Sequence, residues 1–161
     1  MNIRIGHGID VHKLSKEVPL ILGGIKIEST LGIEGHSDGD VVIHALVDAL
    51  LGALALGDIG QLFPSSDEKF KNYDSTKFLK KVFQEISSYN YNICNIDINI
   101  ILQKPHINKY IRLMKKKISS ILNVQSEQIS IKATTTDYLG FVGDSSGIAA
   151  TATVLILKDE N

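Results

Sequence analysis

The chain is poor in several residue types, and each shortage excludes a class of protein. It has one cysteine, Cys94, so no disulfide can form within it, and we expect a reducing compartment and a small buried side chain there. Its 17 basic residues are matched by 18 acidic ones, which leaves no positive excess for binding nucleic acid or a membrane surface. The run from Lys115 to Lys117 is interpreted as a solvated helix face.

Long apolar runs are also missing. The longest, from Val41 to Leu56, is interrupted by His44 and Asp48 and is too short and too polar to cross a bilayer. The first residues lead into strand-like sequence without a targeting segment, so we expect a cytoplasmic protein, with a plastid protein that has lost its transit peptide as the alternative. With 161 residues, the chain is expected to form a single domain, 1–161.

The spacing of apolar residues predicts a mixed set of strands and helices. We expect strands at residues 3–11, 95–102, 129–135 and 147–157, and a tight hairpin at 19–28 around Gly23-Gly24. The first helix is expected to begin at the segment 37–40 and to end at Gly57, a second begins at Ser75 as its cap, and a third spans 109–122. Between the first two we expect an exposed loop at 58–73. Gly6 and Gly8 in the first strand would admit another backbone or a ligand. This order predicts an α+β fold, an α/β sandwich whose mixed sheet has helices on one face.

Three side chains are candidates for a metal site. Asp10 and His12 are two residues apart on the first strand and therefore point to the same face. His44 shares a helix stripe with Asp40 and Asp48. One aspartate and two histidines suit catalytic zinc with an open position. A buried histidine and aspartate network without metal explains the spacing equally well.

Other polar segments suit an anionic ligand. His36 and Ser37 precede the first long helix, where free backbone amides favour phosphate. Thr134 to Thr136 close a strand, and Asp137 follows with a carboxylate that suits Mg²⁺. Consecutive threonines are also simply good strand formers.

Together these segments resemble one enzyme family. The matching segments are 4–12, 22–24, 36–40, 44–46, 48–53, 57–60, 63–64, 132–136 and 139–141. In order, spacing and total length they are similar to the 2-C-methyl-D-erythritol 2,4-cyclodiphosphate synthase family of the non-mevalonate isoprenoid pathway. The resemblance implies a homotrimer around a threefold axis with active sites between subunits. It also implies that the 2-phosphate of 4-diphosphocytidyl-2-C-methyl-D-erythritol 2-phosphate attacks the β-phosphate, giving the cyclic diphosphate and CMP, as a phosphorus–oxygen lyase does.

The resemblance also implies roles for individual residues. Asp10, His12 and His44 would bind one Zn²⁺ per subunit, and Asp137 a Mg²⁺ or Mn²⁺ at the substrate diphosphate. His36 and Thr135 would stabilise the transition state. Substrate contacts are expected from these zinc ligands Asp10 and His12, from His36 and Thr135, and from Ser37, Asp58, Ile59, Gly60, Phe63, Asp67, Leu102, Pro105, His106, Ile107, Asn108, Ala133, Thr134 and Phe141. Among them, the stretch 102–108 together with Ala133 and Thr134 from a neighbouring subunit would form the cytidine pocket.

Three positions depart from the family pattern. Asp137 stands where Glu is usual, Ser65 where Asp is common, and Asp144 where Arg is common. Ile9, Phe141 and Asp144 are expected to line an apolar cavity on the threefold axis, where arginines in relatives hold an isoprenoid diphosphate. Two alternative functions are a metal-dependent phosphohydrolase that activates water, and a trimeric binding protein that holds a lipid-like ligand in the axial cavity.

Overall fold

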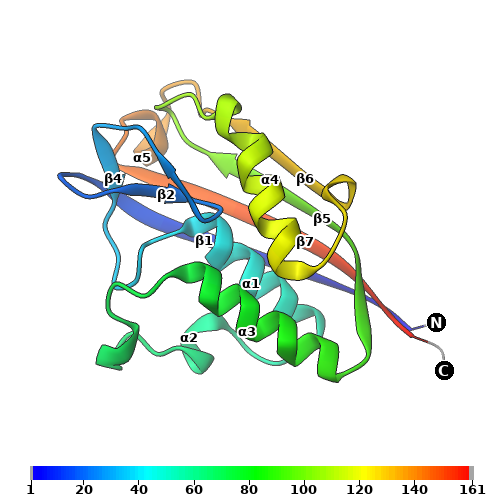
Figure 1. Ribbon diagram of the computed structural model, residues 1–161. Coiled ribbons are helices and arrows are strands. Elements are labelled where there is room, and N and C mark those ends of the chain that lie inside the picture. The colour runs from blue at the N-terminus through cyan, green and yellow to red at the C-terminus, as the bar shows by residue number, and fades with distance from the viewer. Residues whose placement is uncertain (1, 160–161) are drawn as a thin grey trace.

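The computed structural model describes residues 2–159, and a mixed five-stranded sheet organises the fold (Figure 1). The strand order is β4-β1-β7-β5-β6, in which β5 and β6 are parallel and the other neighbours antiparallel. The strands span Ile3–Lys16 (β1), Leu31–Ile33 (β4), Tyr91–Ile101 (β5), Ile129–Thr134 (β6) and Gly147–Lys158 (β7). A small hairpin pairs β2, Leu20–Leu22, with β3, Ile25–Ile27.

Helices cover one face of this sheet. In Figure 1 the three long helices lie on the same side: α1 (Val41–Ala53), α3 (Ser75–Ser88) and α4 (Asn108–Leu122). Short helical segments are α2 (Ile59–Leu62), η1 (Glu68–Phe70), η2 (Ser126–Gln128) and α5 (Gly140–Gly143). The predicted α+β fold with helices on one face is confirmed. Between residues 2 and 159, no helix is long and apolar enough to cross a membrane.

Helix α1 lies directly against strand β1. A Cβ added at Gly6 would stand 1.8 Å from the carbonyl oxygen of Ala49, and one at Gly8 would stand 2.1 Å from that of Ala45. Only glycine permits this approach, so the prediction that these glycines admit another backbone is confirmed. The approach brings the first turns of α1 over the residues of β1 that follow Gly8.

The predicted strands, hairpin and long helices are present, and several details differ. Asp40 is the N-cap of α1, which ends at Ala53 rather than at Gly57. Asp74, not Ser75, caps α3. The segment 58–73 is not one exposed loop, since it contains α2 and η1 and buries Phe70. Strand β4 and helix α5 were not predicted, because three or four residues carry too little periodicity.

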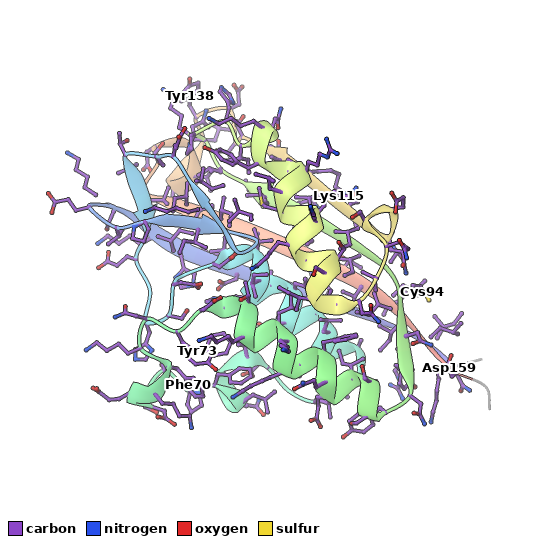
Figure 2. All side chains as sticks on the ribbon, viewed as in Figure 1. Phe70, Tyr73, Cys94, Lys115, Tyr138 and Asp159 are labelled. Carbon is purple, nitrogen blue, oxygen red and sulfur yellow. The ribbon has the colours of Figure 1, made fainter. Side chains whose placement is uncertain are left out.

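Two side-chain predictions have different outcomes. Cys94 is half-buried on β5 rather than buried (Figure 2). It sits where the β5–β7 register shifts, and the side chain of Gln128 donates to its carbonyl at 3.0 Å. The run Lys115 to Lys117 lies on α4 with Lys116 and Lys117 exposed, which confirms the solvated helix face.

The second face of the sheet remains open in the single chain. Odd-numbered residues of β1 point to it, and Ile3, Ile5, Ile9 and Val11 expose 45%, 69%, 59% and 49% of their surface. An apolar strip of this kind is unusual on the surface of a monomer.

Candidate metal and phosphate site

Asp10, His12 and His44 converge between β1 and α1. Asp10 Oδ2 lies 3.1 Å from His12 Nε2 and 3.0 Å from His44 Nδ1. One ligand atom from each of the three side chains lies within 4.8 Å of the others. The predicted grouping is therefore present, although His44 is 34 residues from Asp10 along the chain.

The outward-facing ring nitrogens have protein partners. His12 Nδ1 lies 3.2 Å from the carbonyl oxygen of Glu34, and His44 Nε2 lies 2.9 Å from Ser75 Oγ. Such outer partners typically orient metal-binding histidines and fix which nitrogen carries the proton. The donor set and its outer partners therefore fit a metal ion.

The carboxylate of Asp10 is the negatively charged group of this cluster. Burial alone would raise the pKa of Asp10, but hydrogen bonds with His12 and His44 outweigh it and hold this pKa well below its usual range. The same hydrogen bond to Asp10 raises the pKa of His12 against the effect of burial. A permanent carboxylate between two imidazoles favours a bound cation.

The stripe of Asp40, His44 and Asp48 does not form one site. Asp40 is fully buried and accepts hydrogen bonds from the amides of Gly23, Gly24, Val42 and Ile43, so it joins the hairpin turn to the start of α1. Asp48 accepts a hydrogen bond of 2.7 Å from the amide of Ile59 and so positions α2. Both carboxylates are structural.

A cavity of about 180 Å³ opens beside the metal cluster. Its lining contains predicted residues from β1, the loop before α1, α1 itself and the α2 region: His12, His36, Ser37, His44, Ile59, Gly60 and Phe63. It also contains Ser65, one of the three departures from the family pattern, together with Phe70 and Phe78, which sequence reasoning missed. Phe78 lies on the apolar stripe of α3, where spacing cannot distinguish a cavity wall from core. Asp58 and Asp67 are absent from this lining and instead cap α2 and η1.

Aromatic rings close one side of this first cavity. The ring centroids of Phe63 and Phe78 are 4.5 Å apart, and Phe70 meets Phe63 edge-on at 5.5 Å. Figure 2 shows Phe70 and Tyr73 beside α3, and Tyr73 stacks on Phe78 at 4.9 Å. The segment 63–73 is thus a packed wall of the cavity.

A second cavity of about 290 Å³ lies where β5 and β6 end. Because these strands are parallel, their carboxyl ends meet, and the amide of Leu102 donates to the carbonyl of Thr134 at 3.0 Å. The lining comprises Leu102, Pro105, His106, Ile107, Asn108, Ala133, Thr134 and Thr135. Both segments predicted for the cytidine pocket therefore lie together within one chain.

The remaining predicted residues lie around these two cavities. His36 lines the first cavity and Thr135 the second, and the two linings share no residue, so a single chain does not bring this pair together. Asp137 follows β6 with a positive φ of 52°. Phe141 on α5 is 49% exposed, and Asp144 follows as the C-cap of α5.

These features define an α+β protein with a carboxylate and two histidines arranged for a metal, a cavity of about 180 Å³ beside them, and a second cavity at the ends of two parallel strands. A family model described as the YgbB family matches residues 3–157, so the chain belongs to this family. It is 53% identical over 154 residues to the 2-C-methyl-D-erythritol 2,4-cyclodiphosphate synthase of Natranaerobius thermophilus, covering 96% of this chain and 98% of that one.

Solved structures give the same result. The IspF of Plasmodium falciparum in complex with CDP matches with a TM-score of 0.87 and 40% identity, covering 99% of each chain. The bifunctional IspDF of Campylobacter jejuni matches with a TM-score of 0.94 and 40% identity, covering 98% of this chain and 43% of that one. The present chain thus spans less than half of that bifunctional protein.

Proposed function

We propose that this chain converts 4-diphosphocytidyl-2-C-methyl-D-erythritol 2-phosphate into 2-C-methyl-D-erythritol 2,4-cyclodiphosphate and CMP, a step of isoprenoid precursor synthesis. The observation that carries the proposal is the cluster of Asp10, His12 and His44 beside the first cavity, in a chain of this family. The relatives named for this activity and the neighbour bound to CDP support it.

The reaction is an intramolecular phosphoryl transfer. An oxygen of the 2-phosphate forms a bond to the β-phosphorus, the bond from that phosphorus to the bridging oxygen breaks, and CMP leaves with the bridging oxygen. No base has to remove a proton, because the attacking phosphate is already an anion. The protein therefore has to align the two phosphates and neutralise crowded negative charge.

The two metal ions of the proposal have different donor sets. Asp10, His12 and His44 would hold Zn²⁺, for which nitrogen and carboxylate donors with an open position are typical. When bound, such an ion supplies Lewis-acid neutralisation of a phosphate oxygen. Asp137 would contribute one carboxylate to Mg²⁺ or Mn²⁺ together with substrate phosphates.

In this proposal, the residues around each cavity bind a different part of the substrate. His36 and Ser37 donate hydrogen bonds to phosphate in the first cavity, while Ile59, Gly60 and Phe63 surround the methylerythritol part and the aromatic wall excludes water. The second cavity takes the cytidine between 102–108 and Ala133-Thr134, and Thr135 donates to the phosphates.

A homotrimer completes this site. His36 and Thr135 line separate cavities, so the first cavity of one subunit must meet the second cavity of its neighbour. The open sheet face supplies the contact, since Ile5 and Ile9 would be buried against the threefold axis. We further propose that the enzyme is cytoplasmic.

The test is an assay of CMP release with and without a chelator, with the phosphorus products identified by NMR. We expect chelator-sensitive release of CMP together with the cyclic diphosphate. A linear phosphate product would indicate a phosphohydrolase instead. Binding without any turnover would indicate a binding protein.

A further inference from the structure

The ring of His44 makes hydrogen bonds on the side that faces away from Asp10. Its Nε2 lies 2.9 Å from Ser75 Oγ and 3.2 Å from Ser37 Oγ. Ser75 is fully buried in the first turn of α3, and both its hydroxyl and its amide donate to the carboxylate of Asp38. A chain of hydrogen bonds therefore runs from the imidazole through a buried hydroxyl to a carboxylate.

The carboxylate determines the direction of each bond in this chain. Asp38 accepts backbone amides on both oxygens, from Asp40 at 3.2 Å and from Ser75 at 3.0 Å. A carboxylate can only accept, so the single hydroxyl proton of Ser75 points to Asp38, and Ser75 Oγ can only accept from His44. When a metal ion occupies the cluster, the neutral ring of His44 therefore carries its proton on Nε2 and offers the lone pair of Nδ1 to the ion.

We propose that Ser75 and Asp38 are positioning residues that hold His44 in the tautomer and ring orientation needed to bind a metal ion through Nδ1. This inference rests on the metal site of the proposed function. Metal-binding histidines commonly donate their second N–H to a carboxylate or a carbonyl. His12 uses the carbonyl of Glu34 directly, whereas His44 reaches a carboxylate through one serine.

Ser37 is a poorer partner for the same N–H group. Its hydroxyl is farther from His44, is only half-buried, lines the first cavity, and also lies 3.4 Å from the amide of Gly39. Because Ser75 satisfies the imidazole from within the core, the hydroxyl of Ser37 remains free for a ligand. The two serines therefore have separate tasks, Ser75 for the metal ligand and Ser37 for the substrate.

The experiment measures zinc affinity by competition with a chromogenic chelator in wild type, Ser75→Ala and Asp38→Asn. We expect both variants to bind zinc about 10–100-fold more weakly. In zinc-loaded protein with ¹⁵N-labelled histidine, the Nε2 proton of His44 should be protected from exchange in wild type and lost to exchange in Ser75→Ala.

Asp74→Ala is the matched control. It removes the cap of α3, a hydrogen bond of 2.8 Å to the amide of Thr76, next to Ser75 but outside the chain of bonds to His44. Its zinc affinity should equal that of wild type. Unchanged zinc affinity in folded Ser75→Ala, or an equal loss in Asp74→Ala, would overturn the positioning role. A wild type that binds no zinc would overturn the proposed metal site, and the inference with it.

Discussion

Gly8 on β1 and Ala45 on α1 are so close that a Cβ on Gly8 would lie 2.1 Å from the carbonyl oxygen of Ala45. Ala45 follows His44, and Gly8 is on the same strand face as Asp10, so this contact sets the separation of the metal ligands. The site thus depends on a residue with no functional group.

The first prediction tests this contact. Gly8→Ala should push α1 away from β1, lower the free energy of unfolding by about 1–3 kcal/mol and reduce zinc affinity. Gly52→Ala on α1 is the control, because its Cβ would meet nothing closer than 3.9 Å, and it should stabilise the helix by about 0.5–1 kcal/mol. Urea unfolding and zinc titration measure both effects. A Gly8→Ala variant with normal zinc affinity would contradict the argument.

The second prediction concerns metal content. His44→Ala should lose both zinc and activity while the fold persists, because the ring supplies a ligand at the start of a helix whose other buried residues stay in place. Elemental analysis should find about one zinc per chain in wild type. His7→Ala is the control and should keep its zinc, because the ring of His7 lies on the open sheet face, 3.0 Å from the hydroxyl of Thr153. Zinc-free, fully active wild type would refute the assignment.

The third prediction concerns pH. Burial raises the pKa of Asp40 from 3.8 to about 6, although several backbone amides donate to it. Between these values the folded state binds more protons, so the contribution of Asp40 to stability is full below pH 3.8 and is lost as the pH rises through about 6. Relative to Asp40→Asn, wild type should lose up to about 3 kcal/mol over this window in urea unfolding. A constant difference between the two proteins would show that Asp40 does not titrate there.

The fourth prediction concerns assembly. Ile5→Glu places a charge on a residue that is 69% exposed on the open sheet face and should convert the proposed trimer into an inactive monomer. Leu113→Glu is the control, since Leu113 on α4 is 50% exposed and belongs to the helical layer. Sedimentation and CMP release should both distinguish the two variants. A fully active monomer would contradict the shared site.

The fifth prediction concerns the axial cavity that the resemblance implies. Hydrogen bonds from the side chain and backbone of Ser146 lower the pKa of Asp144, so three carboxylates would face any diphosphate there. Calorimetry should find weak or no binding of farnesyl diphosphate to wild type and tighter binding to Asp144→Arg, with Asp144→Asn between them. Tight binding by wild type, unchanged in Asp144→Arg, would show that position 144 does not contact this ligand.

Much of the fold could be predicted because its elements are long and periodic. The alternation in β1 and the apolar stripes of α3 and α4 result from burial of one face of each element. Such a pattern is visible in the sequence of that element alone. The segment 58–73 could not be predicted in the same way, because α2 and η1 are each too short to show a period. Its aromatic rings pack on Phe78 of α3, and the position of Phe78 on the apolar stripe of that helix predicts only a core residue.

The sequence alone determined the local geometry of the site: Asp10 and His12 share a strand face because side chains alternate there. Only the tertiary structure decided which polar residues join them. Asp40, His44 and Asp48 occupy one stripe of α1, yet backbone amides from the hairpin and from α2 use the two carboxylates and leave His44 for Asp10. Ser75 likewise has the sequence position of a helix cap, but its hydroxyl instead contacts the imidazole of His44. Such partners come from segments far apart along the chain, and packing of the core brings them together.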